Sequence, residues 1–106
     1  MKLHTKPLSE IFPQSVCNAI ELIIERAKPG QVILFGSRAR GDFKTRSDYD
    51  FAISVPATTE TAAILLNVQE NAPTLCGIDI VNLDEVSENF KKRIHQEGVV
   101  LYERPL

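Results

Sequence analysis

The chain has 106 residues, of which 43% are apolar and 25% charged, and this predicts one globular domain over residues 1–106. A net charge of −2 excludes the broad basic excess of typical nucleic-acid-binding domains, so we expect no direct sequence-specific nucleic-acid binding. No run of about 18 apolar residues and no signal-peptide pattern is present, so we expect no membrane partner and a cytoplasmic location.

The first half of the chain predicts two helices and two strands. Apolar residues recur at helical spacing from Pro13 to the Pro29-Gly30 pair, which predicts a helix over this stretch. Beyond it, the pattern predicts a buried strand, a short helix, a polar loop and a second strand, over residues 32–35, 37–40, 41–47 and 49–55.

The second half predicts two more helices and two more strands. A break at residues 56–59 provides an N-cap for a helix that runs to about Asn71. Its apolar positions include Ala62, Leu65, Leu66 and Val68. The pattern then predicts a loop over 73–77 and a strand over 78–83. A helix follows, which is capped by Asp84 or Ser87 and ended by Gly98. Residues 99–102 are predicted to form a short terminal strand or an extended tail. The resulting order, α-β-(short α)-β-α-β-α-β, predicts an α/β (α+β) domain with helices packed on one small sheet.

Two aspartates, Asp48 and Asp50, stand at the start of the second predicted strand. Successive side chains of a strand point to opposite faces, so we expect these two to project together and Tyr49 to point away. Two carboxylates so close repel each other unless they are protonated or neutralised by a cation. Their oxygen atoms are suitable ligands for Mg²⁺. The pattern alone is also compatible with a pair of solvated aspartates.

A third aspartate, Asp79, lies between two isoleucines in the third predicted strand. This placement is unusual, because burying an isolated charge is costly. If the strands are neighbours, Asp79 can join Asp48 and Asp50 on one face, and three carboxylates can hold two metal ions about 4 Å apart. We expect Asp79 to be both a metal ligand and the base. The open alternative is a capped or edge-exposed aspartate.

The Gly36-Ser37 pair follows the first buried strand directly. Glycine lets the backbone turn tightly and approach a ligand, and the amides of the next helix start can bind a phosphate. The alternative is a plain strand-to-helix turn with Ser37 as the N-cap. Four basic residues lie between this turn and the predicted metal ligands, and they indicate either a polyanion site or a solvated loop: Arg38, Arg40, Lys44 and Arg46.

Together these residues resemble the nucleotidyltransferase superfamily related to DNA polymerase beta. The shared pattern is Gly-Ser, ten residues, Asp-x-Asp, and a third Asp on a later strand. The framing is similar too, with LFGSRARG after a strand, SDYDFAI at the start of the next, and EGVVLYER at the end, as in stand-alone minimal nucleotidyltransferase (MNT) domains. Phe51 replaces the aliphatic residue that is more usual after the second aspartate.

The resemblance implies a fold, a site and its cofactors. The fold would be a small mixed β-sheet with helices packed mainly on one face. Mg²⁺, as two ions, would be bound by Asp48, Asp50 and Asp79, and ATP would be the substrate. The nucleotide would be bound by Gly36, Ser37, Arg38 and Arg40.

The resemblance also implies a partner. Minimal nucleotidyltransferases of this type are paired with a HEPN-domain RNase in type VII-like toxin–antitoxin modules, and this chain would be the antitoxin. It would be a protein adenylyltransferase that moves AMP from ATP to a tyrosine of the HEPN toxin. Two alternatives stay open: a non-catalytic antitoxin that acts by binding alone, and a small-molecule nucleotidyltransferase completed by a helical partner subunit.

Overall fold

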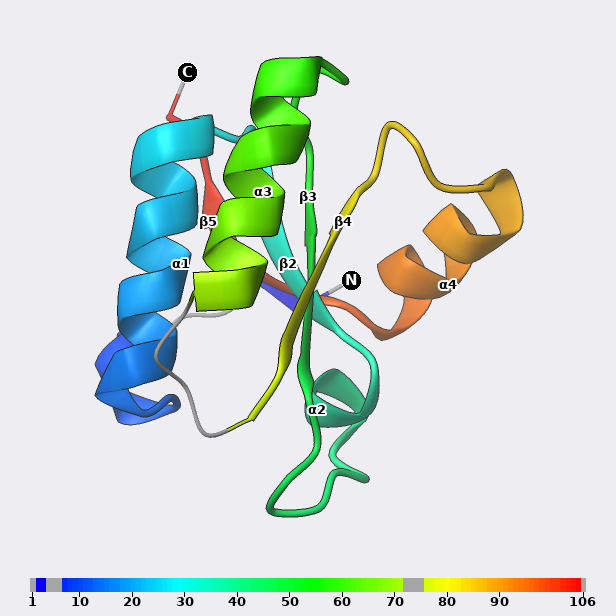
Figure 1. Cartoon of the computed structure of the whole chain (residues 1–106). Coiled ribbons are helices and arrows are strands. Elements are labelled where there is room, and N and C mark those ends of the chain that lie inside the picture. Colours follow the sequence, from blue (N-terminus) through cyan, green and yellow to red (C-terminus); the bar gives the residue numbers. More distant parts are fainter. Residues whose placement is uncertain (1, 4–6, 72–75, 106) are drawn as a thin grey trace.

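The computed structural model describes residues 2–3, 7–71 and 76–105, which form an α/β arrangement around one sheet (Figure 1). The strands are β1 (Lys2–Leu3), β2 (Gln31–Phe35), β3 (Tyr49–Ile53), β4 (Ile78–Asn82) and β5 (Val99–Glu103). The helices are the 3-10 turn η1 (Leu8–Glu10), α1 (Gln14–Ala27), α2 (Ser37–Arg40), α3 (Thr59–Asn71) and α4 (Glu88–Glu97).

The predicted helices and strands are confirmed, with shifts of one or two residues at their ends. β1 and η1 were not predicted, because two or three residues are too few to show a periodic pattern. The loop predicted over 73–77 lies outside the described residues for positions 73–75.

The five strands form one mixed sheet in the order β1-β5-β2-β3-β4. β2 runs antiparallel to both β3 and β5, whereas β4 runs parallel to β3 and β1 runs parallel to β5. This topology confirms the expected small mixed sheet. It also makes β3 and β4 neighbours, so their first residues lie at the same end of the sheet.

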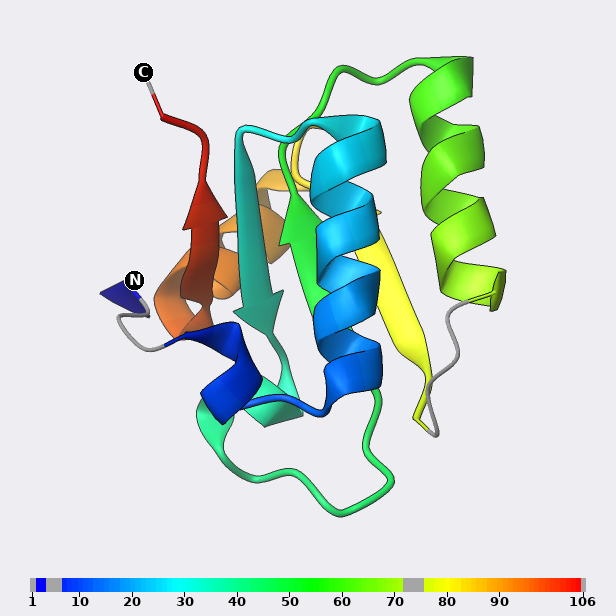
Figure 2. The ribbon, with the colours of Figure 1, turned by 90° about the vertical axis from the view of Figure 1, so that its left-hand side faces the viewer.

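Helices cover the two faces of the sheet unequally, as Figures 1 and 2 show. One face carries α1 and α3, and its core includes the fully buried side chains of Ile20, Ile23 and Phe51. The other face carries α4, whose Ile94 packs in a smaller cluster with Ile33. Because strand side chains alternate, Tyr49 and Phe51 lie on the α1 face, and the even-numbered residues of β3 lie on the α4 face.

Three local expectations are refined by the structure. Ser87, not Asp84, caps α4, since its hydroxyl accepts a hydrogen bond from the Phe90 amide at 3.2 Å. Gly98 ends α4 as expected and is extended, and a side chain there would clash with the Ile94 carbonyl and with Ile33. Leu66, one of the apolar positions named for the predicted helix, is 54% exposed in α3.

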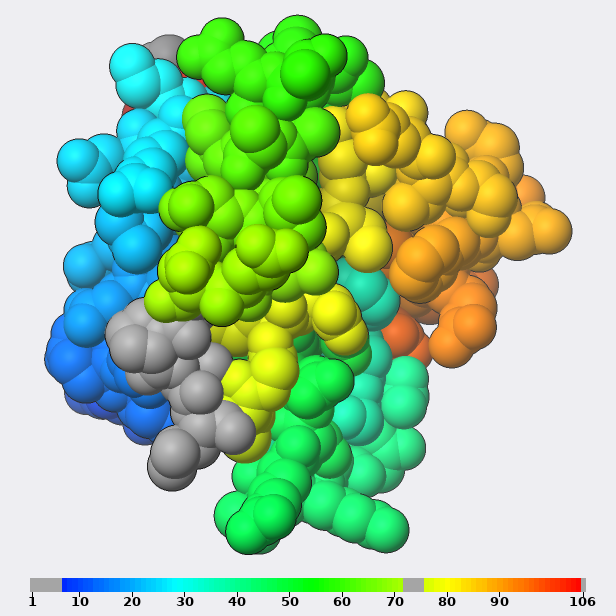
Figure 3. All heavy atoms as spheres, in the orientation of Figure 1, coloured from blue at the N-terminus to red at the C-terminus, as the bar shows by residue number. Residues whose placement is uncertain are grey.

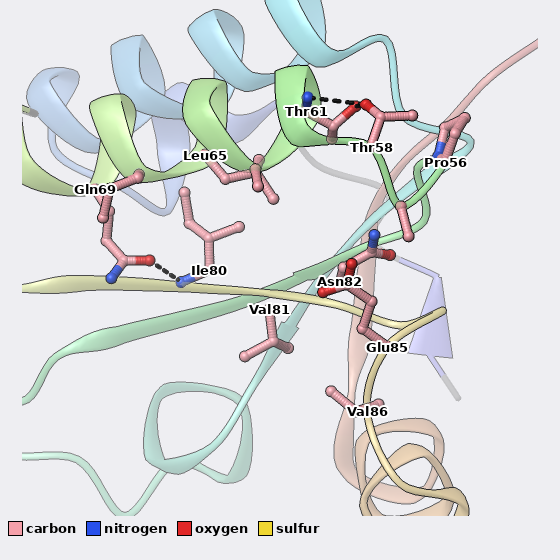
Figure 4. Close-up of a pocket in the computed structure, with 13 residues that line it drawn as sticks. Pro56, Thr58, Thr61, Leu65, Gln69, Ile80, Val81, Asn82, Glu85 and Val86 are labelled. Atoms are coloured by element: carbon pink, nitrogen blue, oxygen red, sulfur yellow. Dashed lines mark hydrogen bonds between the residues drawn. The ribbon is translucent and has the colours of Figure 1, made fainter.

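β4 is an edge strand, and its atoms are visible between α3 and the segment that leads into α4 (Figure 3). A hollow of about 410 Å³ follows this edge, lined by Leu65, Ile80 and Val86 among others (Figure 4). The Gln69 side chain accepts a hydrogen bond from the outward amide of Ile80 at 2.9 Å, which partly protects the edge. Among the described residues, none of the helices has the length and apolar character needed to cross a bilayer.

Candidate active site

The three predicted carboxylates lie at the start of β3 and β4, on the face that also carries α4. Asp50 and Asp79 are direct partners in the parallel β3–β4 register. Asp48 immediately precedes β3, and its Oδ1 accepts a hydrogen bond from the Gly77 amide at 3.1 Å, so it bridges to the start of β4. Tyr49 is buried on the opposite face, as the strand alternation requires.

The Gly36 turn lies against Asp50, because Phe35 is the antiparallel partner of Asp50 at the end of β2. Gly36 has a φ of 74° and a ψ of −157°, a conformation almost confined to glycine. A Cβ atom at this position would lie 2.3 Å from Asp50 Oδ2. The glycine therefore allows both the backbone angle and the close approach of the turn to a carboxylate.

The carboxylates differ in exposure and therefore in electrostatics. Asp48 and Asp79 are exposed, whereas Asp50 is half-buried. Burial raises the pKa of the Asp50 carboxyl above its ordinary value, and the negative charges of Asp79 and Asp48 raise this pKa further. The charge of Arg40 opposes the rise. Asp50 is therefore the carboxylate that is partly buried, whereas Asp79, which lies between two isoleucines in the sequence, is exposed.

Arg40 and a residue that the sequence did not single out, Glu97, complete this region. Arg40 Nη1 lies 3.1 Å from Glu97 Oε2, and Arg40 Nε lies 3.3 Å from Asp42 Oδ2. The other oxygen of Glu97 accepts a hydrogen bond from the Gly36 amide at 2.9 Å. One signal could have identified Glu97: a carboxylate at the C-terminal end of a helix is disfavoured by the helix dipole, so its presence needs a local reason.

Arg38 lies on the other face of the sheet, away from the carboxylates. Its guanidinium group stacks between two aromatic rings, 4.4 Å from the centroid of Phe43 and 4.3 Å from that of Tyr49. It also donates hydrogen bonds to the carbonyl oxygens of Thr45 and Ser47. This arrangement holds the loop between α2 and β3 against the sheet, so we leave Arg38 out of the proposed nucleotide site.

We predict that Arg38→Lys will lower the free energy of unfolding by about 1–2 kcal/mol. Lysine keeps the charge but lacks the planar fork that stacks between two rings and bonds two carbonyls. Urea unfolding followed by circular dichroism measures the change. Arg46→Lys, at an exposed position in the loop that Arg38 contacts, is the matched control and should change stability by less than about 0.5 kcal/mol. Equal effects of the two changes would contradict this role.

The donor set is chemically suited to Mg²⁺, since three carboxylates share one face and Arg40 offsets only part of their charge. In the conformation described, however, no three acidic, histidine or cysteine side chains within the described ranges converge closely enough to hold one ion. Asp48 Oδ1 instead accepts the hydrogen bond from the Gly77 amide.

Comparison with known proteins addresses the same segment. The polymerase beta nucleotidyltransferase family matches residues 18–105, which include every residue of the candidate site. A curated relative, "Protein adenylyltransferase MntA" of Aphanizomenon flos-aquae (strain 2012/KM1/D3), is 33% identical over 89 residues. That alignment covers 70% of this chain, and the chain spans 57% of the length of the relative.

Solved structures share the fold. One is a toxin–antitoxin with AMP-PNP, with a TM-score of 0.69 and 23% identity, covering 82% of this chain and 73% of the other. Another is the toxin–antitoxin MntA–HepT, with a TM-score of 0.61 and 19% identity, covering 86% of this chain and 72% of the other.

Proposed function

Because the chain belongs to the polymerase beta nucleotidyltransferase family, we propose that it is an antitoxin of the MntA type that transfers AMP from ATP to a partner toxin. The acceptor in this proposal is a tyrosine hydroxyl of a HEPN-domain RNase. Two comparisons support the choice: the name of the curated relative and the AMP-PNP-containing toxin–antitoxin with the same fold. A cytoplasmic location goes with it, because ATP is made and used inside cells.

One observation carries the proposal. The Gly36 turn approaches the Asp50 carboxylate so closely that a Cβ atom would lie 2.3 Å from Oδ2, and Asp79 is the direct β4 partner of Asp50. A turn that can receive a polyphosphate thus lies next to carboxylates that can neutralise it through cations. Simple binding of a partner would not need these groups together.

Each residue has a proposed role in this scheme. Gly36 would let the triphosphate approach the backbone, and the Ser37 hydroxyl, which bonds no other described residue, would donate to a phosphate oxygen. Arg40 lies on the same face and would add positive charge. Asp48, Asp50 and Asp79 would hold Mg²⁺, which supplies charge neutralisation on the phosphates and a lower pKa for the attacking hydroxyl.

The proposed reaction forms one bond to phosphorus and breaks one. The tyrosine oxygen attacks the α-phosphorus of ATP, and the bond from that phosphorus to the bridging oxygen of the β-phosphate breaks. Pyrophosphate leaves, and the hydroxyl proton passes to Asp79 and then to solvent. The chain itself contributes mainly positioning and electrostatic stabilisation, which are the main sources of catalysis in phosphoryl-type transfers.

Intact-mass spectrometry of the HEPN partner, incubated with this chain, ATP and Mg²⁺, tests the proposal. We expect the partner mass to increase by one or more AMP units, and the increase to map to a tyrosine. The control is the double variant Asp48→Ala, Asp50→Ala, which should produce no increase because both proposed metal ligands are lost.

Neutralisation of the toxin in cells, compared between the wild-type chain and the double variant, distinguishes AMP transfer from binding alone. If the double variant protects cells from a co-expressed toxin as well as the wild-type chain does, a binding-only antitoxin is the better explanation. If AMP is found on an added small molecule and not on the partner protein, the chain is the catalytic part of a small-molecule nucleotidyltransferase.

A further inference from the structure

Glu97 connects three parts of the chain at the candidate site. It is the last residue of α4, and its side chain is only 17% exposed. One carboxylate oxygen accepts from the Gly36 amide at 2.9 Å, and the other lies 3.1 Å from the Arg40 guanidinium. The end of α4 is thereby tied to both ends of α2, the helix that follows the glycine turn.

The location of this carboxylate is electrostatically unfavourable unless those two donors compensate it. Glu97 lies at the C-terminal end of a helix, where the dipole disfavours negative charge. It also lies close enough to Asp50 for the two negative charges to repel each other. A partly buried carboxylate that bonds a backbone amide and a guanidinium group satisfies both oxygens and offsets this cost.

We propose that Glu97 is a positioning residue for the nucleotide, acting through Gly36 and Arg40. This inference rests on the proposed function, since it concerns how the nucleotide site is held in shape. α2 has only four residues and is flanked by glycines with positive φ at both ends, so it has little rigidity of its own. Glu97 holds the Gly36 turn at one end of α2 and the Arg40 guanidinium at the other.

The partners of Arg40 show why its contact with Glu97 matters. It has a second carboxylate partner, Asp42, whose side chain is 62% exposed and lies in the loop beyond α2. Without Glu97, Asp42 would be the remaining carboxylate partner of Arg40 among the described residues. The guanidinium would then move toward the loop and away from Asp50, and the nucleotide would lose a cation that the fold now holds on the carboxylate face.

Two substitutions and a control test this role. Glu97→Ala removes both contacts, whereas Glu97→Gln keeps an oxygen that can accept from the Gly36 amide and removes only the charge that pairs with Arg40. Gln96→Ala changes the exposed neighbour in the same helix. For each variant, we would record the amide ¹H–¹⁵N signal of Gly36 and measure the affinity for AMP-PNP with Mg²⁺ by calorimetry.

The expected order of effects is Ala, then Gln, then control. In Glu97→Ala the Gly36 amide proton should shift upfield, and AMP-PNP affinity should fall about tenfold, the scale of one lost charge-assisted hydrogen bond. In Glu97→Gln the Gly36 signal should stay near its wild-type position, and affinity should fall about threefold. Gln96→Ala should match the wild type in both measurements.

Three results would overturn the inference. Affinity equal to or tighter than wild type in a folded Glu97→Ala chain would show that the carboxylate does not position the nucleotide. If that variant does not fold, wild-type or tighter affinity in Glu97→Gln would do the same. An unmoved Gly36 signal in Glu97→Ala would show that Glu97 does not bond the Gly36 amide, and this would contradict the inference alone. A wild-type chain that binds no AMP-PNP would instead contradict the proposed function.

Discussion

Asp50→Asn is expected to reduce AMP transfer by about 1,000-fold or more, while leaving the protein folded. Asp50 is the half-buried carboxylate between the glycine turn and Asp79, so it is the ligand best placed to bring a cation to the phosphates. Asparagine has nearly the same shape but no negative charge, and a neutral amide oxygen is a much weaker ligand for Mg²⁺. Initial rates of partner modification, measured by intact mass, give the size of the loss.

The same substitution should raise thermal stability at neutral pH in the absence of divalent metal. The pKa of Asp50 is raised in the folded state by burial and by the charges of Asp79 and Asp48. A group of this kind contributes stability at acidic pH that is lost as the pH rises through the folded-state pKa. The Asn variant has no such charge, so its advantage in Tm over the wild type should disappear in acid.

The matched control for Asp50→Asn is Asp84→Asn. Asp84 is exposed and lies after β4, outside the carboxylate face. This change should leave both transfer and Tm near wild-type values. Substantial transfer by the Asp50→Asn chain would remove Asp50 from the proposed metal ligands. A lower Tm in that chain at neutral pH would show that its carboxylate stabilises the fold instead of serving the site.

Gly36→Ala is expected to destabilise the fold by about 3 kcal/mol and to reduce transfer by at least about 100-fold. Two physical effects combine. An alanine at φ 74° and ψ −157° is strained, and its Cβ would lie 2.3 Å from Asp50 Oδ2, so the turn or the carboxylate must move. Urea unfolding measures the stability, and the intact-mass assay measures the transfer.

Gly41→Ala separates the effect of backbone strain from the effect of displacing the turn or the Asp50 carboxylate. Gly41 also has a positive φ, of 92°, but an added Cβ there meets no atom within 4 Å. This variant should lose only about 1–2 kcal/mol through backbone strain and should retain most of its transfer activity. If the two alanine variants lose transfer equally at a temperature where both are folded, the close approach of Gly36 to Asp50 is not what the reaction requires.

Local patterns predicted most of the secondary structure and gave most residues of the candidate site. The apolar spacing of α1, the buried run of β2 and the polar loop after α2 are each visible within a short window, because side chains a few residues apart share a face. The Gly-Ser turn and the aspartates on either side of Tyr49 are likewise visible within a short stretch of sequence. The family match over residues 18–105 agrees with the resemblance that these residues suggested.

Contacts between side chains that the fold brings together could not be predicted from short stretches of sequence. Arg38 and Arg40 are two positions apart in one short basic segment, yet the first stacks on Tyr49 on one face and the second pairs with Glu97 on the other. The exposure of Asp79 and the half-burial of Asp50 likewise depend on which strand lies at the edge of the sheet. The single domain over residues 1–106 and the roles of the site residues stay predictions.

The sequence by itself thus determined the family of this chain and most residues of its candidate site, because a turn glycine and alternating carboxylates are local features with local physical consequences. Only the tertiary structure decided how those groups are held. It placed Asp79 beside Asp50 through the parallel β3–β4 pairing, and it brought Glu97, 61 residues away, to the Gly36 amide. Contacts at such separations depend on the packing of whole helices and strands, which no short window of sequence contains.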